Sequence, residues 1–313
     1  MAPADSIHIE QAASILKAGG LVAFPTETVY GLGADATNDQ AVAKIFETKQ
    51  RPAFNPLIIH IKNIEQAFEF AEFNDLSNQL TTAFWPGALT LVLRRKKGSK
   101  LSLLATAGLD TVAVRMPNHP VAQSLLAAAN VPIAAPSANL SGTISPTQAG
   151  HVDGQFSGSL TLNMVLDGGP CTVGLESTIV DISGKIPTLL RPGGLAKEDI
   201  EAVIGPLAIN ASEDIIAPGQ LKSHYAPSIP LRMNVKADEV KPGESLLAFG
   251  ANAPTKALNL ATTANLIEAA ANLFAMMRTL DTPGSAGIAV MPIPNEGLGV
   301  AINDRLKRAS ATK

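Results

Sequence analysis

The chain has 313 residues, of which 46% are hydrophobic and 16% charged, and its net charge is -3. This composition excludes a fibrous or largely disordered chain, and the negative charge disfavours a protein whose main task is to coat nucleic acid. No apolar run approaches the roughly 20 residues that span a bilayer, and the first residues do not resemble a secretory signal. The single cysteine, Cys171, allows neither an intramolecular disulfide nor a cysteine-based zinc site, so we expect a cytoplasmic protein.

Short apolar runs alternate with helix-like segments in the first two thirds of the chain. Residues 9–20 illustrate the helical pattern, because Ile9, Ala12 and Leu16 fall on one face. Helices are predicted over residues 9–20, 38–49, 63–72, 75–83, 118–129 and 196–204. Strands are predicted over residues 21–24, 56–61, 89–95, 111–116, 131–135, 163–167, 177–182 and 188–191. The pattern predicts an α/β fold with a twisted, mixed sheet.

A proline-rich segment follows this region. Residues 206–230 lack a periodic apolar pattern, which is typical of a connector between domains. After it, predicted strands at residues 245–250 and 287–293 and predicted helices at residues 265–281 and 297–310 indicate a smaller α/β unit. We therefore expect a catalytic domain over residues 1–205, a linker over 206–230 and a C-terminal α/β domain over 231–313.

Irregular polar segments follow several predicted strands. Residues 25–33 combine three hydroxyl groups, a carboxylate and two glycines, and residues 136–142 are rich in small polar side chains. The carboxyl ends of strands are where open α/β sheets place ligands, and such loops can turn backbone N–H groups toward an anion. Each segment alone is equally compatible with a self-capping turn or a plain polar loop.

Several charged side chains stand at fixed positions. Lys49 and Arg51 precede two prolines, which stiffen the segment, and two fixed cations suit a polyphosphate. They are equally typical of cations that end a helix. Arg115 ends a hydrophobic strand and needs an anion, either an internal carboxylate or a ligand's. His60, near a strand end, is alone no more than a core histidine.

The chain lacks the common phosphate and hydrolase motifs. It contains no GxxxxGK[ST] loop, no full GxGxxG fingerprint, no HExxH and no GxSxG, and its histidines show no metal-ligand spacing. This points to a phosphate-handling site without a P-loop and without a protein nucleophile. The basic run at residues 94–97 is either a solvated turn or a weak RNA-facing patch.

The polar segments and fixed cations described above resemble those of the YrdC-like domain of L-threonylcarbamoyladenylate synthases. The resemblance rests on residues 24–36, 49–61, 84–93, 112–120, 135–147, 174–182 and 189–194. Residues 217–227 (APGQLKSHYAP) and 297–309 (GLGVAINDRLKRA) are similar to the linker and the last helix of the long, two-domain form. The linker begins with Ala217, where we would expect serine in many relatives.

The resemblance implies an enzyme that condenses L-threonine, bicarbonate or CO2, and ATP into threonylcarbamoyl-AMP and pyrophosphate. The threonine amine would take up CO2, and the resulting carboxylate would attack the α-phosphorus of ATP. The resemblance implies Mg2+ carried by the triphosphate and no metal site of the protein itself. It also implies a downstream threonylcarbamoyl-transfer machinery that modifies tRNA beside the anticodon, a weak tRNA contact at most, and no membrane association.

The resemblance further implies a set of site residues. Its KxR…SxN signature gives the expected catalytic residues Lys49, Arg51, Ser137 and Asn139. The expected threonine contacts are Thr28, His60, Arg115, Ser137 and Ser177. The expected ATP contacts are Lys49, Arg51, Asn55, Thr111, Ala135, Asn139, Ser145, Arg191 and Tyr225. Tyr225 lies in the linker, which we expect to cover the nucleotide as a lid.

Two functions of other classes stay open. A double-stranded-RNA-binding module would use the positively charged concave surface of this family, although the acidic balance of this chain disfavours it. A carbamoyl-transfer accessory domain occurs in hydrogenase maturation proteins with the same signature, but their zinc-finger modules require more cysteines than this chain has.

Overall fold

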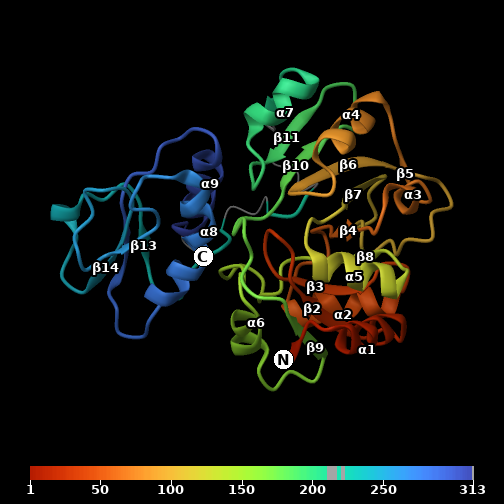
Figure 1. The fold of residues 1–313 in the computed structure, drawn as a ribbon, viewed down its shortest axis with the longest axis horizontal. Coiled ribbons are helices and arrows are strands. Elements are labelled where there is room, and N and C mark those ends of the chain that lie inside the picture. The colour runs from red at the N-terminus through yellow and green to blue at the C-terminus, as the bar shows by residue number, and fades with distance from the viewer. Residues whose placement is uncertain (210–216, 220–222, 312–313) are drawn as a thin grey trace.

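Two sheets organise the chain, as Figure 1 shows. The structure is a computed structural model that describes residues 1–209, 217–219 and 223–311. The large unit (residues 1–209) is built on a 12-stranded sheet, and the small unit (residues 231–311) on a four-stranded sheet. The small unit, blue in Figure 1, lies beside the large unit, with α8 and α9 on the side that faces it.

The large sheet mixes parallel and antiparallel pairs, as predicted. Its strand order is β1-β9-β2-β3-β8-β4-β7-β6-β10-β11-β12, with β5 paired to β6. The strands are β1 Ala2–Pro3, β2 Leu21–Phe24, β3 Gly31–Asp35, β4 Ile58–His60, β5 Ala71–Glu72, β6 Leu89–Arg95, β7 Thr111–Arg115, β8 Ile133–Ala134, β9 Leu162–Asp167, β10 Thr178–Asp181, β11 Thr188–Arg191 and β12 Ala208–Ile209. Strand β4 pairs in parallel with β7, so that His60 and Arg115 are neighbours across the two strand ends.

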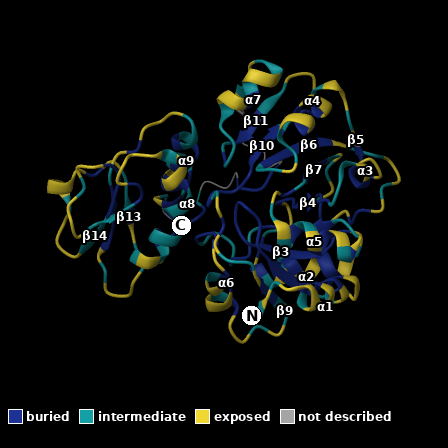
Figure 2. Cartoon of the chain, viewed as in Figure 1, coloured by how far each residue is buried: buried dark blue, intermediate teal, exposed yellow. Residues whose placement is uncertain are grey.

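Amphipathic helices cover this sheet. They are α1 Ser6–Lys17, α2 Asp39–Lys49, α3 Ile64–Ala67, α4 Asp75–Phe84, α5 Pro120–Ala129, α6 Ala149–Phe156 and α7 Lys197–Ile204. Helix α1 buries Ile9, Ala12 and Leu16, which is the predicted face, and the Asn38 side chain caps α2 by accepting from the backbone N–H of Gln40. Figure 2 shows that the strands are buried, whereas exposed residues lie on the outer sides of the helices.

The small unit shares its core with the large one. Its strands are β13 Leu231–Arg232, β14 Glu244–Ala248, β15 Leu258–Asn259 and β16 Gly287–Val290, all paired in parallel, and its helices are α8 Leu266–Leu280, α9 Leu298–Ala309 and a 3-10 turn at Ala237–Glu239. Val29, Ile144 and Leu175 of the large unit pack in the same apolar cluster as residues of these helices. The small unit is therefore seated on loops that belong to the large unit.

Two of the differences between the structure and the predicted elements have a clear physical reason. Residues 31–33 were expected in an irregular segment, yet they begin β3. A Cβ on Gly33 would lie 2.8 Å from the Phe24 ring, so this glycine serves close packing inside the sheet. The helix predicted over 63–72 is limited to α3, because the chain then turns to pair β5 with β6.

Candidate active site

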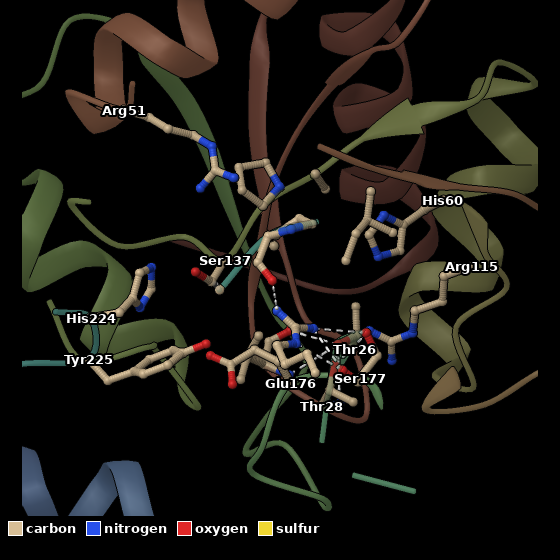
Figure 3. A pocket seen from close by; sticks show the side chains of 18 residues that line it. Thr26, Thr28, Arg51, His60, Arg115, Ser137, Glu176, Ser177, His224 and Tyr225 are labelled. Atoms are coloured by element: carbon tan, nitrogen blue, oxygen red, sulfur yellow. Dashed lines mark hydrogen bonds between the residues drawn. The ribbon is translucent and has the colours of Figure 1, made fainter. Parts of the chain in front are cut away.

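A pocket opens among the loops that follow β2 and β8 and the ends of β4, β7 and β11 (Figure 3). Together with the open solvent at its entrance, the pocket holds about 530 Å³ of space that no protein atom fills. Its lining residues are Thr26, Thr28, Val29, Gly31, Arg51, Ile58, His60, Arg115, Ala135, Pro136, Ser137, Glu176, Ser177, Arg191, Pro218, Gly219, His224 and Tyr225. Guanidinium, hydroxyl and imidazole groups thus converge on one cavity.

Arg115 organises one side of the pocket. Its Nη2 lies 2.6 Å from a carboxylate oxygen of Glu27, and its Nη1 donates to Oγ1 of Thr28 at 2.8 Å. Thr26 fixes the loop between them, since its hydroxyl accepts from the backbone N–H of Val29 and donates to the carbonyl of the same residue. Arg115 was expected to need an anion, either an internal carboxylate or a ligand's, and Glu27 is an internal carboxylate paired with it.

His60 stands next to Arg115 as a neutral ring. Burial and the charge of Arg115 lower the pKa of His60 to about 3, so the imidazole is uncharged at neutral pH. Its ring contacts Phe24 edge-on at 6.1 Å between centres. No residue of the described part of the chain hydrogen-bonds its Nδ1. A buried polar atom of this kind is available to a ligand.

Two further buried guanidinium groups line the pocket. Arg51 donates to the carbonyls of Asn55 and Pro56, and Arg191 donates to the carbonyls of Ser177 and Pro218. Burial lowers the pKa of Arg51 to about 10, and the charge of Arg191 lowers it as well. Burial also lowers the pKa of Arg191, and so do the charges of Arg305 and Arg115. Within the described ranges neither one has a carboxylate partner. Two such charges attract an anion.

Lys49 lies behind the pocket wall. Its Nζ donates to the carbonyl of Ser137 at 2.6 Å and to the carbonyl of Asn139. Burial, together with the charge of Arg51, lowers the pKa of Lys49 well below its ordinary value. The side-chain amide of Asn139 in turn donates to the carbonyl of Thr143 at 3.0 Å. The four signature residues are thus brought together, with Lys49 holding the loop that presents Ser137.

Glu176 contributes the negative charge on the pocket floor. Burial alone would raise its pKa, but Arg305 and Arg191 hold the pKa of Glu176 below its ordinary value. Its Oε1 accepts from the hydroxyl of Ser145, and its Oε2 accepts from Nε of Arg305 at 2.7 Å. Beside it, the hydroxyl of Ser177 lies 2.7 Å from that of Thr90.

The described linker residues reach the same pocket. Pro218, Gly219, His224 and Tyr225 line it, whereas residues 210–216 and 220–222 of the predicted linker lie outside the described residues. The Tyr225 ring stacks on Phe274 of α8, with 5.6 Å between centres and 27° between planes. The linker tyrosine is therefore packed against the small unit while it faces the cavity.

All predicted site residues but Thr111 lie at the pocket, in two groups. Nine of them line the pocket: Thr28, Arg51, His60, Arg115, Ala135, Ser137, Ser177, Arg191 and Tyr225. Four lie just behind and hydrogen-bond a lining residue: Lys49, Asn55, Asn139 and Ser145.

Thr111 is the exception among the predicted ATP contacts. It starts β7, whereas Arg115 at the pocket ends that strand, and five strand residues span on the order of 13 Å. Thr111 instead lines a separate surface pocket with Arg94, Arg95 and Lys97. The structure therefore does not bring Thr111 to the candidate site.

Glu176 and Arg305 are charged residues of the site to which the sequence assigned no contact. Glu176 lines the pocket, and Arg305 binds it from α9. The helical spacing contained a signal for Arg305, because it falls on the face formed by Ala301, Ile302 and Leu306. A lone cation on an apolar face requires a partner, and here that partner comes from the other unit.

The described ranges contain no group of three or more His, Cys, Asp and Glu side chains placed to hold a metal ion. No helix in that part of the chain has the length and hydropathy needed to cross a membrane.

Comparison with known proteins identifies relatives over the whole length. The family model described as "Telomere recombination" matches residues 14–193, and the model described as "Threonylcarbamoyl-AMP synthase, C-terminal domain" matches residues 195–311. The chain is 42% identical to the threonylcarbamoyl-AMP synthase of Bacillus subtilis, over 97% of this chain and 93% of that protein. It is also 42% identical to the protein of that name from Pyrococcus abyssi, over 96% of this chain and 94% of the relative.

Solved structures agree with these matches. The crystal structure of Pyrococcus abyssi Sua5 complexed with L-threonine superposes with a TM-score of 0.90 at 41% identity, over 98% of this chain and 95% of that one. Escherichia coli YciO, at 22% identity and a TM-score of 0.55, covers 60% of this chain and 90% of its own, which shows a shared fold for the large unit alone.

Proposed function

The chain belongs to the threonylcarbamoyl-AMP synthase family, and from that premise we propose that its pocket condenses L-threonine, bicarbonate and ATP into threonylcarbamoyl-AMP and pyrophosphate. The chain is thus an enzyme of the nucleotidyltransferase type that acts in tRNA modification. One observation supports this most: the cavity combines a neutral imidazole and hydroxyl groups with two guanidinium charges that have no carboxylate partner among the described residues.

Threonine binds on the side of Arg115 in this proposal. Its carboxylate is attracted by Arg115, while the hydroxyls of Thr28 and Ser177 and the unpaired Nδ1 of His60 can bond its hydroxyl or amine. Ser137 completes the subsite from the opposite loop. The Pyrococcus abyssi relative, solved as a complex with L-threonine, supports threonine as a ligand of this chain.

ATP binds on the side of Arg51 and Arg191. Their charges can pair with phosphate oxygens bidentately, which suits a polyphosphate. Ala135 also lines the pocket. The four residues behind the wall (Lys49, Asn55, Asn139 and Ser145) hold the loops in place. Thr111 has no place in this subsite.

The reaction proceeds through substrate groups rather than a protein nucleophile. The threonine amine adds to CO2 derived from bicarbonate and loses a proton, and the new carboxylate attacks the α-phosphorus, so that pyrophosphate leaves. The protein lowers the barrier by positioning the two substrates and stabilising the charge that moves onto the leaving pyrophosphate. Arg51 and Arg191 supply that charge stabilisation.

Mg2+ enters with the triphosphate in this proposal. The lining carboxylate Glu176 and the adjacent Glu27 are each paired with an arginine, so the donors that Mg2+ prefers are better supplied by phosphate oxygens and water. The ion would neutralise the phosphates during the attack.

The linker acts as a lid over the nucleotide. Tyr225 and His224 line the pocket mouth, and covering it would exclude water while the unstable N-carboxylate reacts. Tyr225→Ala should weaken ATP binding and lose most synthesis, whereas Tyr225→Phe, which keeps the stack on Phe274, should retain most of both. If Tyr225→Ala binds ATP and turns over like the wild type, the linker is only a spacer.

The domain division and the partners follow from the same proposal. Residues 1–205 form the catalytic domain, 206–230 the linker and lid, and 231–313 the C-terminal domain. The product passes to a threonylcarbamoyl-transfer machinery in the cytoplasm, and tRNA contacts this chain weakly if at all.

Pyrophosphate release tests the function directly. The purified full chain should release pyrophosphate only when ATP, threonine and bicarbonate are all present, and mass spectrometry should find threonylcarbamoyl-AMP. Release without threonine, or a product of another mass, would reject the proposal. Tight binding of double-stranded RNA without product formation would favour the RNA-binding module instead.

A further inference from the structure

Arg305 of α9 is a charged side chain with no exposure to solvent. It packs on the apolar face of the helix beside Ile302 and Leu306. A buried guanidinium is unfavourable unless its donors are bonded, so its partners explain why it is there.

The contacts of Arg305 reach across to the large unit. Its Nε donates to Glu176 at 2.7 Å, and its Nη2 donates to the carbonyl of Pro192 at 3.0 Å. Its Cζ lies 5.0 Å from the centre of the Tyr225 ring, and its Nη1 bonds Asp304 at 2.7 Å. Arg305 therefore links the last helix of the small unit to Glu176 on the pocket floor.

Glu176 is placed to compete with a ligand for the pocket cations. Its carboxylate faces the same cavity as Arg191, and the charge of Arg191 helps to keep Glu176 ionised. The ion pair of Glu176 within the described ranges is nevertheless with Arg305, while Arg191 bonds only carbonyl and hydroxyl oxygens there. The carboxylate is held by one arginine, and the other stays available to an anion.

We propose that Arg305 is a positioning residue for the nucleotide: by holding Glu176, it keeps Arg191 available for the phosphates of ATP. This inference rests on the proposed function. It assigns to the small unit a defined part in binding, carried by one buried side chain. The Tyr225 ring, which Arg305 also contacts, is in addition stacked on Phe274.

ATP binding by calorimetry on the full chain tests the proposal. Arg305→Met frees the Glu176 carboxylate to pair with Arg191, so ATP affinity should fall about tenfold or more, while threonine affinity should stay within about twofold. Lys307→Met is the matched control, since Lys307 is an exposed cation on the same helix and its loss should change neither affinity. Equal loss of both ligands in Arg305→Met, or no loss of either, would overturn the proposal.

A second substitution separates positioning from plain structural support. Adding Glu176→Gln to Arg305→Met removes the competing carboxylate and keeps a side chain that can bond Ser145, so ATP affinity should return to within about threefold of the wild type. If Arg305→Met does not fold, the double variant, in which both buried charges are gone, decides the matter. A folded double variant with a tenfold loss of ATP affinity would refute the proposed role.

The measurement of ATP affinity does not depend on product formation. A wild type that binds ATP but makes no threonylcarbamoyl-AMP would reject the proposed function, yet the comparison of ATP affinities would still test Arg305. A wild type that binds no ATP would reject the proposed function and, with it, the inference drawn from it.

Discussion

Gly174 should be the most sensitive point of contact between the two units. It has φ +74°, and a Cβ added there would lie 2.5 Å from both the carbonyl oxygen of Ala270 and the Cα of Ala271 in α8. Gly174→Ala would therefore strain its own backbone and also push against the backbone of α8. Because Gly174 is two residues from Glu176, the shift should reach the pocket floor.

The magnitude follows from two terms. An alanine at this φ costs about 1–2 kcal/mol, and forcing extra atoms into a packed contact costs about 1–3 kcal/mol more. Gly158→Ala is the matched control, since Gly158 has φ +78° but no heavy atom within 4 Å of its added Cβ. The control includes the first term only, so the two variants should differ by about 1–3 kcal/mol in the free energy of unfolding.

Urea unfolding followed by circular dichroism measures this difference, and pyrophosphate release measures its effect on turnover. We expect Gly174→Ala to be the less stable variant and to lose activity, whereas Gly158→Ala keeps the activity of the wild type. If both variants lose the same stability and both keep full activity, then the contact between α8 and Gly174 is not tight, and the seating of the small unit does not control the pocket.

Three further predictions concern ligands and pH. Arg51→Ala should nearly abolish synthesis, because a charge-assisted hydrogen bond to phosphate contributes about 1.5–3 kcal/mol, and Lys49→Ala should do so because it loses the bonds that hold the Ser137 loop; near-normal pyrophosphate release in both would contradict the proposed site. Serine should be a poor substrate and 2-aminobutyrate a poorer one, since a missing methyl costs only about 1–3 kcal/mol while a missing hydroxyl leaves buried polar groups unpaired; competition assays in which 2-aminobutyrate matches threonine would count against the subsite. Burial lowers the pKa of His60 and of His224 to about 3, from 6.5 for the exposed ring, so each histidine should lower the free energy of unfolding as the pH falls below 6.5. The free energy of unfolding falls by about 2 kcal/mol per histidine between pH 6.5 and pH 5. Urea unfolding at these two pH values should show a smaller fall for His60→Gln than for the wild type.

Local chemistry explains why much of the fold could be predicted from the sequence. The buried face of α1, the helix α2 and the strands at Leu21–Phe24 and Leu89–Arg95 depend on residues within one turn or one strand, and all are confirmed. The failures are equally physical. Gly31 and Gly33 read as loop residues, but their missing side chains make room for Phe24 and the neighbouring strand, which only the folded sheet brings close.

The site divides in the same way. The sequence contained the residue types of a phosphate-handling pocket, and its resemblance to a family indicated which side chains to expect there. Only the tertiary structure decided that Lys49 lies behind the wall on the carbonyls of Ser137 and Asn139, that Thr111 is at the far end of its strand, and that Glu27 is the partner of Arg115.

The pairing of Arg305 with Glu176 is the clearest case, because 129 residues separate the two in sequence. Helical spacing shows that Arg305 faces a core, but spacing cannot name the carboxylate that meets it. Periodicity and caps are set by neighbours along the chain, whereas the partner of a buried charge is set by which distant elements pack together.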